Sequence, residues 1–169
     1  EGARYVVTPG FVEMGAKQRG DIKEICDLVK PEMGIITSVG EMHLETFGSV
    51  ESVARTKFEL IDALPEGGFG IVNIDSEAAA RYIADNAIKV HSYAVEAAEA
   101  DYRAVDIQYG SAETRFGVAK RDGLDEGYAT HILGRGNLLN ITAALAVAEH
   151  MGVLLESRRR AVRQIEQVE

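Results

Sequence analysis

The sequence lacks several features that would assign it to a membrane or secreted class. It has a single cysteine, Cys26, so no disulfide can form within the chain, which fits a reducing compartment. No apolar run approaches the roughly 18 residues of a membrane-spanning helix. The first residues also lack the basic-then-apolar pattern of a secretory signal. These absences lead us to expect a soluble protein of the cytoplasm with no membrane span.

Positive charge is also scarce. The chain carries 18 Lys and Arg against 27 Asp and Glu, which gives a formal net charge of -9 at pH 7. Binding to a nucleic-acid backbone needs a basic footprint, so we expect no nucleic-acid partner. An acidic protein can still bind an anionic nucleotide, because a divalent cation and local backbone amides can supply the positive charge.

A phosphate-binding loop is missing as well. Such a loop needs glycines at a fixed spacing, then lysine and a hydroxyl residue. The one glycine-lysine neighbourhood, Gly15-Ala16-Lys17-Gln18, has neither that spacing nor the hydroxyl. The chain as written therefore lacks the usual means of holding the β- and γ-phosphates of a nucleotide.

The order of apolar segments indicates an α/β fold. At 169 residues the chain has the length of one domain with its own core. Strand and helix patterns alternate through residues 1–90, which predicts a mostly parallel sheet with helices on both faces. Between Val90 and Leu133 the alternation has period two and predicts a small antiparallel patch. We expect strands at residues 5–7, 11–12, 33–39, 69–74 and 128–133, and helices at 21–29, 50–63, after Ser76, at 137–152 and at the end.

Three residues are candidate N-caps, because their side-chain oxygens can accept from free backbone amides in a helix's first turn. Asp21 precedes an apolar stripe, Ser49 precedes the helix that carries Lys57, and Asn137 precedes an apolar helix.

Lys57 is an anomaly of the pattern. At helical spacing it falls inside the apolar arc of its own helix. One interpretation is that the side chain reaches out to solvent along its apolar stem. The other is a buried amine near carboxylates, metal or phosphate, which loses its proton more easily and becomes modifiable. The arc comprises Val50, Val53, Ala54, Leu60, Ile61 and Leu64.

Two further positions follow predicted strands. His43 and Glu45 lie in a loop after the apolar run 33–39, and Glu13 follows a short strand piece before Gly15. In open α/β sheets, ligands bind outside the carboxyl ends of the strands. Imidazole and carboxylate can both ligate a divalent cation. A loop His-x-Glu alone is usually surface, but three such residues at strand ends favour a shared site.

Asn137 and Asn140 are candidates for contacts with a ligand. Asn137 closes Gly134-Arg135-Gly136-Asn137, which lacks the third glycine of a dinucleotide fingerprint. A capping role for Asn137 and a ligand role for both asparagines, one turn apart, remain open. The run Arg158-Arg159-Arg160 is interpreted as a solvated helix face.

Taken together, these motifs resemble the central, ATP-binding domain of the Mur ligase family. Within it, the Glu-Met-Gly-Ala form is similar to the branch that adds D-alanyl-D-alanine. The resemblance covers nearly the whole chain and is weakest from about Ala78 to Tyr128. It rests on Glu13-Met14-Gly15-Ala16, Gly20-Asp21-Ile22, residues 31–40, His43-Leu44-Glu45, Phe47-Gly48-Ser49, Lys57-Phe58-Glu59-Leu60, Leu64-Pro65-Glu66-Gly67, Asn73-Ile74-Asp75, Gly134-Arg135-Gly136-Asn137, Asn140 and Ala143-Ala144.

The resemblance implies a fold like that of phosphate-loop NTPases and an enzyme of peptidoglycan synthesis, cell shape and cell division. In that reaction ATP and Mg2+ convert the carboxylate of a UDP-N-acetylmuramoyl-tripeptide to an acyl phosphate, which the amine of D-Ala-D-Ala displaces. By resemblance the metal ligands are Glu13, His43 and Lys57, and His43 and Lys57 are catalytic. Lys57 matches a lysine that is carbamylated in several members. Asn137 and Asn140 match adenine contacts, and Asp75 lies near the ribose.

The sequence departs from the family at several points. Ser38 stands where the family usually has Asn, and Gly136 where it often has His. The phosphate loop and the flanking N- and C-terminal domains have no counterpart, and a family segment is missing at Phe11-Val12. We therefore expect residues 1–169 to be part of a central domain, inactive alone, with ATP affinity of about millimolar. A non-catalytic nucleotide-binding or scaffolding domain, or a related Mur-type amide ligase with another substrate, remain alternatives.

Overall fold

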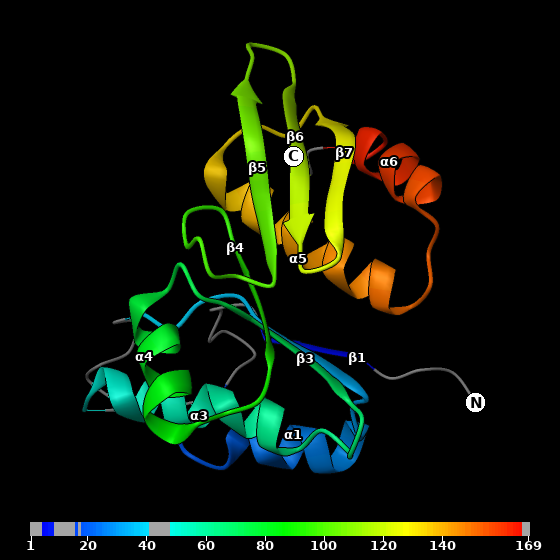
Figure 1. The fold of residues 1–169 in the computed structure, drawn as a ribbon. Coiled ribbons are helices and arrows are strands. Elements are labelled where there is room, and N and C mark those ends of the chain that lie inside the picture. The colour runs from blue at the N-terminus through cyan, green and yellow to red at the C-terminus, as the bar shows by residue number, and fades with distance from the viewer. Residues whose placement is uncertain (1–4, 9–15, 17, 41–47, 167–169) are drawn as a thin grey trace. The chain divides into compact units, whose positions relative to one another are not determined.

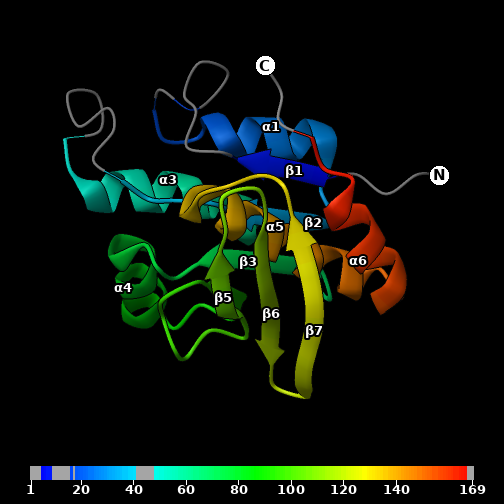
Figure 2. The same cartoon turned by 90° about the horizontal axis from the view of Figure 1, so that it is seen from above.

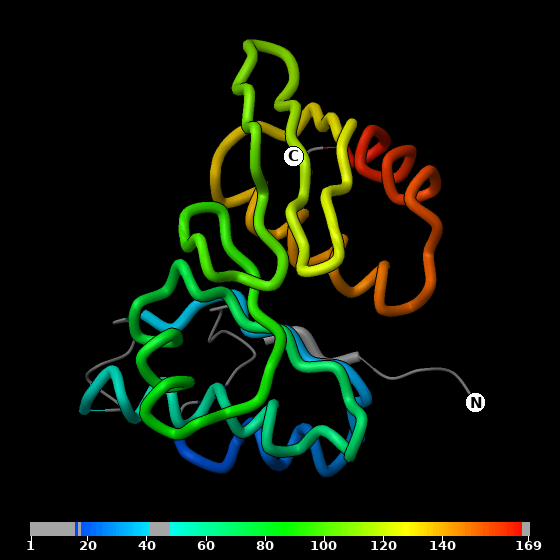
Figure 3. Tube along the Cα trace, viewed as in Figure 1, coloured from blue at the N-terminus to red at the C-terminus, as the bar shows by residue number. Residues whose placement is uncertain are grey.

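The computed structural model describes residues 5–8, 16, 18–40 and 48–166. The chain divides into two compact units, Glu1–His91 and Ser92–Glu169, and the single domain expected from length remains a prediction. Figure 1 gives the ribbon and Figure 3 the path of the chain. The elements are β1 (Tyr5–Thr8), α1 (Asp21–Val29), β2 (Met33–Ile36), α3 (Val50–Asp62), β3 (Phe69–Asn73), α4 (Glu77–Asn86), β4 (His91–Ala94), β5 (Tyr102–Tyr109), β6 (Thr114–Lys120), β7 (Gly123–Thr130), α5 (Arg135–His150) and α6 (Leu155–Arg163).

The first unit is a parallel β-α arrangement. β2 lies between β1 and β3 and is parallel to both, and its last ladder pair with β3 is Ile36 with Val72. α1, α3 and α4 pack on one face of these strands (Figure 1). Ile36, Val72 and Phe58 are fully buried between the strands and the helices, so the core of this unit lies on that face.

A pair of glycines lets α3 approach the strands closely. Gly34 and Gly70 are register partners on β2 and β3. An ideal Cβ at Gly34 would lie 2.8 Å from Cγ of Leu60, and one at Gly70 would lie 3.0 Å from Cδ1 of Ile61. Both contacts are closer than a methyl group tolerates, because carbon atoms prefer separations of about 3.5–4.0 Å. The bare backbone therefore sets how near α3 sits to the sheet.

The two helix starts of the first unit differ. The Ser49 hydroxyl accepts from the Ser52 amide at 3.1 Å, so its predicted capping role is confirmed. The predicted cap at Asp21 is wrong, because Gly20 takes the N-cap position with a φ of 99°. The missing cap comes from α3 instead: the Glu59 carboxylate accepts from the amides of Gly20 at 2.9 Å and Lys23 at 3.1 Å.

The second unit contains the predicted antiparallel patch. β4 pairs with β5 in parallel, whereas β5, β6 and β7 are antiparallel neighbours (Figure 2). α5 and α6 pack on these strands through a core that includes Tyr128, Leu138 and Val162. The predicted fold class, a mostly parallel sheet with flanking helices and a small antiparallel patch, is confirmed.

Two boundaries in the second unit differ from the prediction. β7 begins at Gly123 and not at Tyr128, because the low-propensity residues between them still pair with β6. α5 begins at Arg135 after Gly134 as N-cap, so the predicted helix start at Asn137 is wrong. Within the residues that the structure describes, no helix combines the length and the apolar character needed to cross a bilayer.

Candidate functional site

Beyond the carboxyl end of β2, side-chain hydrogen bonds take the place of the backbone ladder between β2 and β3. Beyond Ile36, three successive backbone carbonyls, those of residues 37–39, each accept a hydrogen bond from a side chain of a different element. The donors come from the end of β3, from α3 and from the start of α4. The bonds are Asn73 Nδ2 to Thr37 O (2.8 Å), Lys57 Nζ to Ser38 O (2.6 Å) and Ser76 Oγ to Val39 O (2.9 Å).

Of the two interpretations of Lys57, the structure does not show a side chain that reaches out to solvent, and a buried amine near carboxylates, metal or phosphate stays a prediction. Its amine is not extended into solvent, since it donates to the Ser38 carbonyl, and the side chain is half-buried. Burial lowers the pKa of Lys57 below its ordinary value, because the charged form loses hydration. Within the described residues no carboxylate forms an ion pair with it. A desolvated amine is more readily neutral and hence nucleophilic.

Of the predicted metal ligands, one lies within the residues that the structure describes. Glu13 and His43, like Glu45, lie outside the described residues. Among residues 5–8, 16, 18–40 and 48–166, no group of three His, Cys, Asp or Glu side chains has the arrangement of a metal site. Convergence of Glu13, His43 and Lys57 at the strand ends therefore remains a prediction. Only Lys57 is located, at the carboxyl end of β2.

Asp75 lies at the carboxyl end of β3, two residues after its last residue, and the predicted place of Asp75 near the ribose of a nucleotide stays a prediction. Its side chain is half-buried, and its backbone amide donates to Asn73 Oδ1 at 2.9 Å. This bond and the bond from Asn73 Nδ2 to Thr37 use both ends of the Asn73 amide. The backbone on both sides of the β2–β3 carboxyl edge is thus fixed by one buried side chain.

Asn137 and Asn140 both lie in the exposed part of the first turns of α5. Asn137 Nδ2 donates to the Leu133 carbonyl at 2.8 Å, so the side chain braces the turn before the helix. Asn140 lies three residues on and is exposed, whereas Leu138 and Ile141 are buried. The two asparagines share a solvent face of α5 in the second unit, and Asp75 belongs to the first unit.

The sequence missed Asn73 and Ser76 as residues that hold the strand ends. The available signals were weak, because an asparagine after an apolar strand and a serine before a helix are both common in structural roles. Ser76 is the N-cap of α4, but its hydroxyl makes no capping bond. It donates to the Val39 carbonyl and accepts from the Val39 amide at 3.2 Å.

A buried charge cluster in the second unit corrects the interpretation of the Arg run. Arg158 is 7% exposed and pairs with Asp125 at 3.0 Å and with Glu149. Lys120 pairs with the same two carboxylates, at 3.3 and 2.9 Å. Burial alone would lower the pKa of Lys120, but these carboxylates hold it above its ordinary value. The cluster ties α6 to β6, β7 and the end of α5.

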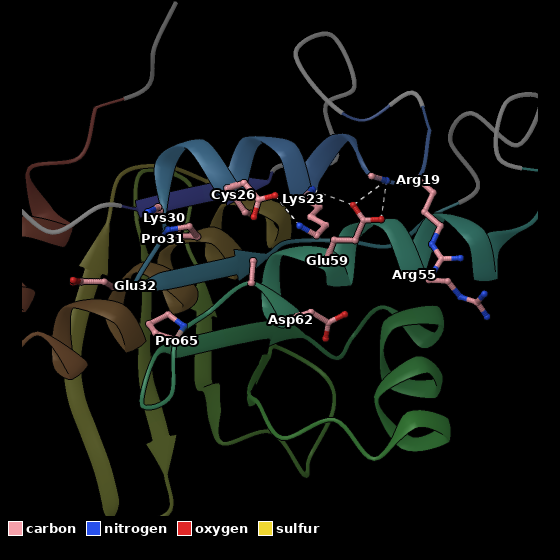
Figure 4. A pocket seen from close by; sticks show the side chains of 13 residues that line it. Arg19, Lys23, Cys26, Lys30, Pro31, Glu32, Arg55, Glu59, Asp62 and Pro65 are labelled. Carbon is pink, nitrogen blue, oxygen red and sulfur yellow. Dashed lines mark hydrogen bonds and ion pairs between the residues drawn. The ribbon is translucent and has the colours of Figure 1, made fainter.

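A cleft of about 830 Å³ lies between α1 and α3 (Figure 4). Pro31 and Pro65, which precede β2 and β3, form one end of it, so it reaches the amino ends of the strands. The wall carries both signs of charge, and Lys23 is paired with Asp27 at 2.7 Å. Ligands of open α/β sheets bind at the carboxyl ends, so this cleft is separate from the Lys57 site.

Comparison with known proteins identifies the class of protein that this fold and site define. The model of the Mur ligase middle domain matches residues 3–148. The chain therefore belongs to the Mur ligase family.

Relatives with several different ligase names within that family match the chain, and two of the most similar share one name. The UDP-N-acetylmuramoyl-tripeptide–D-alanyl-D-alanine ligase of Escherichia coli (strain K12) is 31% identical over 86% of this chain and 32% of its own length. The ligase of the same name from Bacillus subtilis (strain 168) is 27% identical over 89% of this chain and 32% of its own length. The chain thus spans about a third of these relatives.

Solved structures of Mur ligases share the fold of this chain. MurF from Acinetobacter baumannii matches with a TM-score of 0.77 and 25% identity, covering 92% of this chain and 34% of that one. MurF ligase from Thermotoga maritima, solved in complex with ADP, has a TM-score of 0.75 at 21% identity, covering 98% of this chain and 43% of its own. At that identity the second likeness concerns the fold alone.

Proposed function

We propose that this chain is the central, nucleotide-binding part of a cytoplasmic ATP-dependent amide ligase. The ligase adds D-Ala-D-Ala to a UDP-N-acetylmuramoyl-tripeptide in peptidoglycan synthesis. The observation that carries the proposal is the half-buried Lys57 amine, held on Ser38 O at the carboxyl end of β2 with a lowered pKa. Relatives named for this reaction support the choice of substrates.

Lys57 takes part as a carbamate. Its neutral amine attacks the carbon of CO2, a new N–C bond forms, and the nitrogen releases one proton to solvent. Burial favours this step because the neutral amine is the nucleophile. The product is a carboxylate on a long side chain, which converts a cationic position into a ligand for a hard cation.

The donor set fits magnesium. A carboxylate from Glu13, the imidazole of His43 and the carbamate of Lys57 would hold the ion, and hard oxygen donors dominate this set. When bound, Mg2+ neutralises charge on the transferring phosphoryl group. The chain itself contributes the placement of Lys57, which is fixed by the Ser38 carbonyl at one end and by the close packing of α3 at the other.

The proposed nucleotide contacts are those that the family resemblance implies. Asn137 and Asn140 present amides on the exposed start of α5, where they pair with the edge of adenine. Asp75 offers a carboxylate to the ribose hydroxyls. The ADP in the related Thermotoga maritima MurF complex supports a nucleotide ligand for this fold. In the reaction the tripeptide carboxylate takes the γ-phosphoryl group from ATP, and the dipeptide amine then displaces phosphate.

The experiment uses the full-length protein with ATP, Mg2+, UDP-N-acetylmuramoyl-tripeptide and D-Ala-D-Ala. We expect amide formation with release of one phosphate per product. Lys57→Ala should lower kcat by about 100-fold or more, because an electrostatic contact made in the transition state is lost. Arg55→Ala is the matched control on the exposed face of the same helix, where Arg55 pairs with Glu51.

Three outcomes contradict the proposal in different ways. Nucleotide binding without any turnover identifies the non-catalytic nucleotide-binding alternative. Turnover with another acid or amine, but not with D-Ala-D-Ala, identifies a related Mur-type ligase with a different substrate. Full activity in the Lys57→Ala variant means that the Lys57 amine has no part in the reaction.

A further inference from the structure

Ser76 has a hydroxyl that is not used for the role its position suggests. It is the N-cap of α4, with φ -81° and ψ 104°, yet its side chain makes no capping bond. A serine in this position ordinarily accepts from an amide in the first turn, and losing that bond weakens the helix. Here the hydroxyl bonds both the amide and the carbonyl of Val39, at 3.2 and 2.9 Å. The first turn of α4 therefore has no side-chain cap, and the Ser76 hydroxyl binds the backbone of Val39 instead.

Asn73 also holds the segment of residues 37–39, through the carbonyl of Thr37. The residue is 6% exposed and is the last of β3. Its Nδ2 reaches the Thr37 carbonyl at 2.8 Å, where a parallel ladder would have continued beyond Ile36. A buried amide with both ends bonded has no rotational freedom left, so it fixes the direction in which the chain leaves β2.

The residue between these two anchors is the one that binds Lys57. Ser38 lies directly between Thr37 and Val39, and its carbonyl accepts from Lys57 Nζ at 2.6 Å. The bonds from Asn73 and Ser76 to the backbone of Thr37 and Val39 are called the clamp below. Ser38 itself is exposed, and its side chain is not part of the clamp. The position of the Ser38 carbonyl is therefore determined by the bonds on its two neighbours.

We propose that Asn73 and Ser76 are positioning residues for the Lys57 site, because they fix residues 37–39 and with them the carbonyl that orients the Lys57 side chain. This inference rests on the proposed ligase function, in which the nitrogen of Lys57 carries the metal-binding carbamate. Neither residue touches substrate in this scheme. They act through the backbone of residues 37–39.

The test compares Ser76→Ala, Ser76→Thr and Ala80→Gly in the full-length protein. Ser76→Ala removes both bonds to Val39, and Ser76→Thr keeps a hydroxyl that is acceptable at an N-cap. Ala80→Gly is the matched control, because it weakens the interior of α4 and removes only a methyl group, which makes no hydrogen bond. Each variant is assayed for kcat, for KM of D-Ala-D-Ala, for Mg2+ activation and for thermal stability.

We expect Ser76→Ala to lower kcat about tenfold and to shift Mg2+ activation to higher concentration, with KM for D-Ala-D-Ala unchanged. Ser76→Thr should restore most of kcat, and Ala80→Gly should lower thermal stability without changing kcat more than about twofold. If Ser76→Ala and Ala80→Gly lose stability equally and both keep kcat and the Mg2+ response, Ser76 is only structural and the proposal is overturned.

Amide hydrogen exchange tests the clamp independently of whether the proposed ligase function is right. The Val39 amide, which donates to Ser76 Oγ, should exchange about tenfold faster in Ser76→Ala and at the wild-type rate in Ala80→Gly. This readout needs no turnover. If wild type shows the protected amide but no ligation of any substrate, the proposed function fails and the clamp stands. An unchanged Val39 exchange rate in Ser76→Ala refutes the clamp whatever the activity.

Discussion

Gly34→Ala should destabilise the protein through one identifiable contact. A Cβ at Gly34 would lie 2.8 Å from Cγ of Leu60, and Leu60 is fully buried. Carbon atoms need about 3.5–4.0 Å, so either α3 or the Leu60 side chain must move by about 1 Å. Overpacking of this kind costs about 1–3 kcal/mol. The lower entropy of the unfolded chain with alanine offsets about 0.5–1 kcal/mol of this cost, so we expect a net loss of about 1 kcal/mol and at most about 2.5 kcal/mol.

A double-mutant cycle shows whether the loss comes from that contact. Leu60→Ala alone should cost about 2–5 kcal/mol, because it leaves a cavity in the core. In that background the Gly34 methyl enters the cavity, so Gly34→Ala should cost nothing or stabilise. The coupling free energy should then be about 1–3 kcal/mol in favour of the double variant. Urea unfolding followed by circular dichroism measures all four proteins, provided that the m-value is unchanged.

Gly136→Ala is the matched control for the glycine substitution itself. A Cβ there meets no atom within 4 Å, and the residue lies in α5. We expect it to stabilise by up to about 1 kcal/mol, as helix propensity predicts. If Gly34→Ala is as well tolerated as Gly136→Ala, or costs the same with and without Leu60, close approach of α3 is not what requires glycine at position 34.

Two further predictions concern the buried groups of the second unit. Arg158→Ala should lower the free energy of unfolding by about 3–5 kcal/mol, since it leaves Asp125 and Glu149 short of a buried partner, whereas the neighbouring exposed Arg160→Ala should change it by less than about 0.5 kcal/mol in the same urea assay. Burial raises the pKa of Tyr128 to about 12. The folded state then keeps a proton that the unfolded state loses near pH 10, so this part of the stability is present below pH 10 and lost as pH rises to about 12. Stability of wild type and Tyr128→Phe, measured from pH 9 to 12, should diverge in that window, and parallel curves would refute it.

The elements that could be predicted from the sequence are those whose signals are local. The apolar runs of β2 and β3, the helical stripe of α3 and its Ser49 cap each depend on residues close in the chain. β2 is nevertheless shorter than its apolar run, because the bonds made by Asn73 and Ser76 replace the ladder after Ile36. The two residues that each bond joins are separated by 36 or 37 positions in the sequence, so no local pattern encodes these bonds.

The misassigned residues have the same explanation. Residues 123–127 contain two glycines and two acids, so propensity gave no strand, yet Asp125 is buried there by its pair with Arg158. The Arg run has the composition of a solvated face, and only the tertiary fold brings Glu149 to Arg158. For the candidate site, periodicity predicted that Lys57 is unusual. It did not predict that a backbone carbonyl would be its partner.

The cap that Glu59 supplies to α1 has a consequence for how the protein folds. α1 has nine residues, which is shorter than a helix that is stable by itself in water. Its N-cap is a glycine, and the carboxylate that replaces the cap lies 36 to 39 positions further along the chain. The chain must therefore close that loop, with its entropic cost, before α1 gains its cap. A protein emerging N-terminal end first from the ribosome has α1 available early but can complete it only after α3 has been synthesised and has docked.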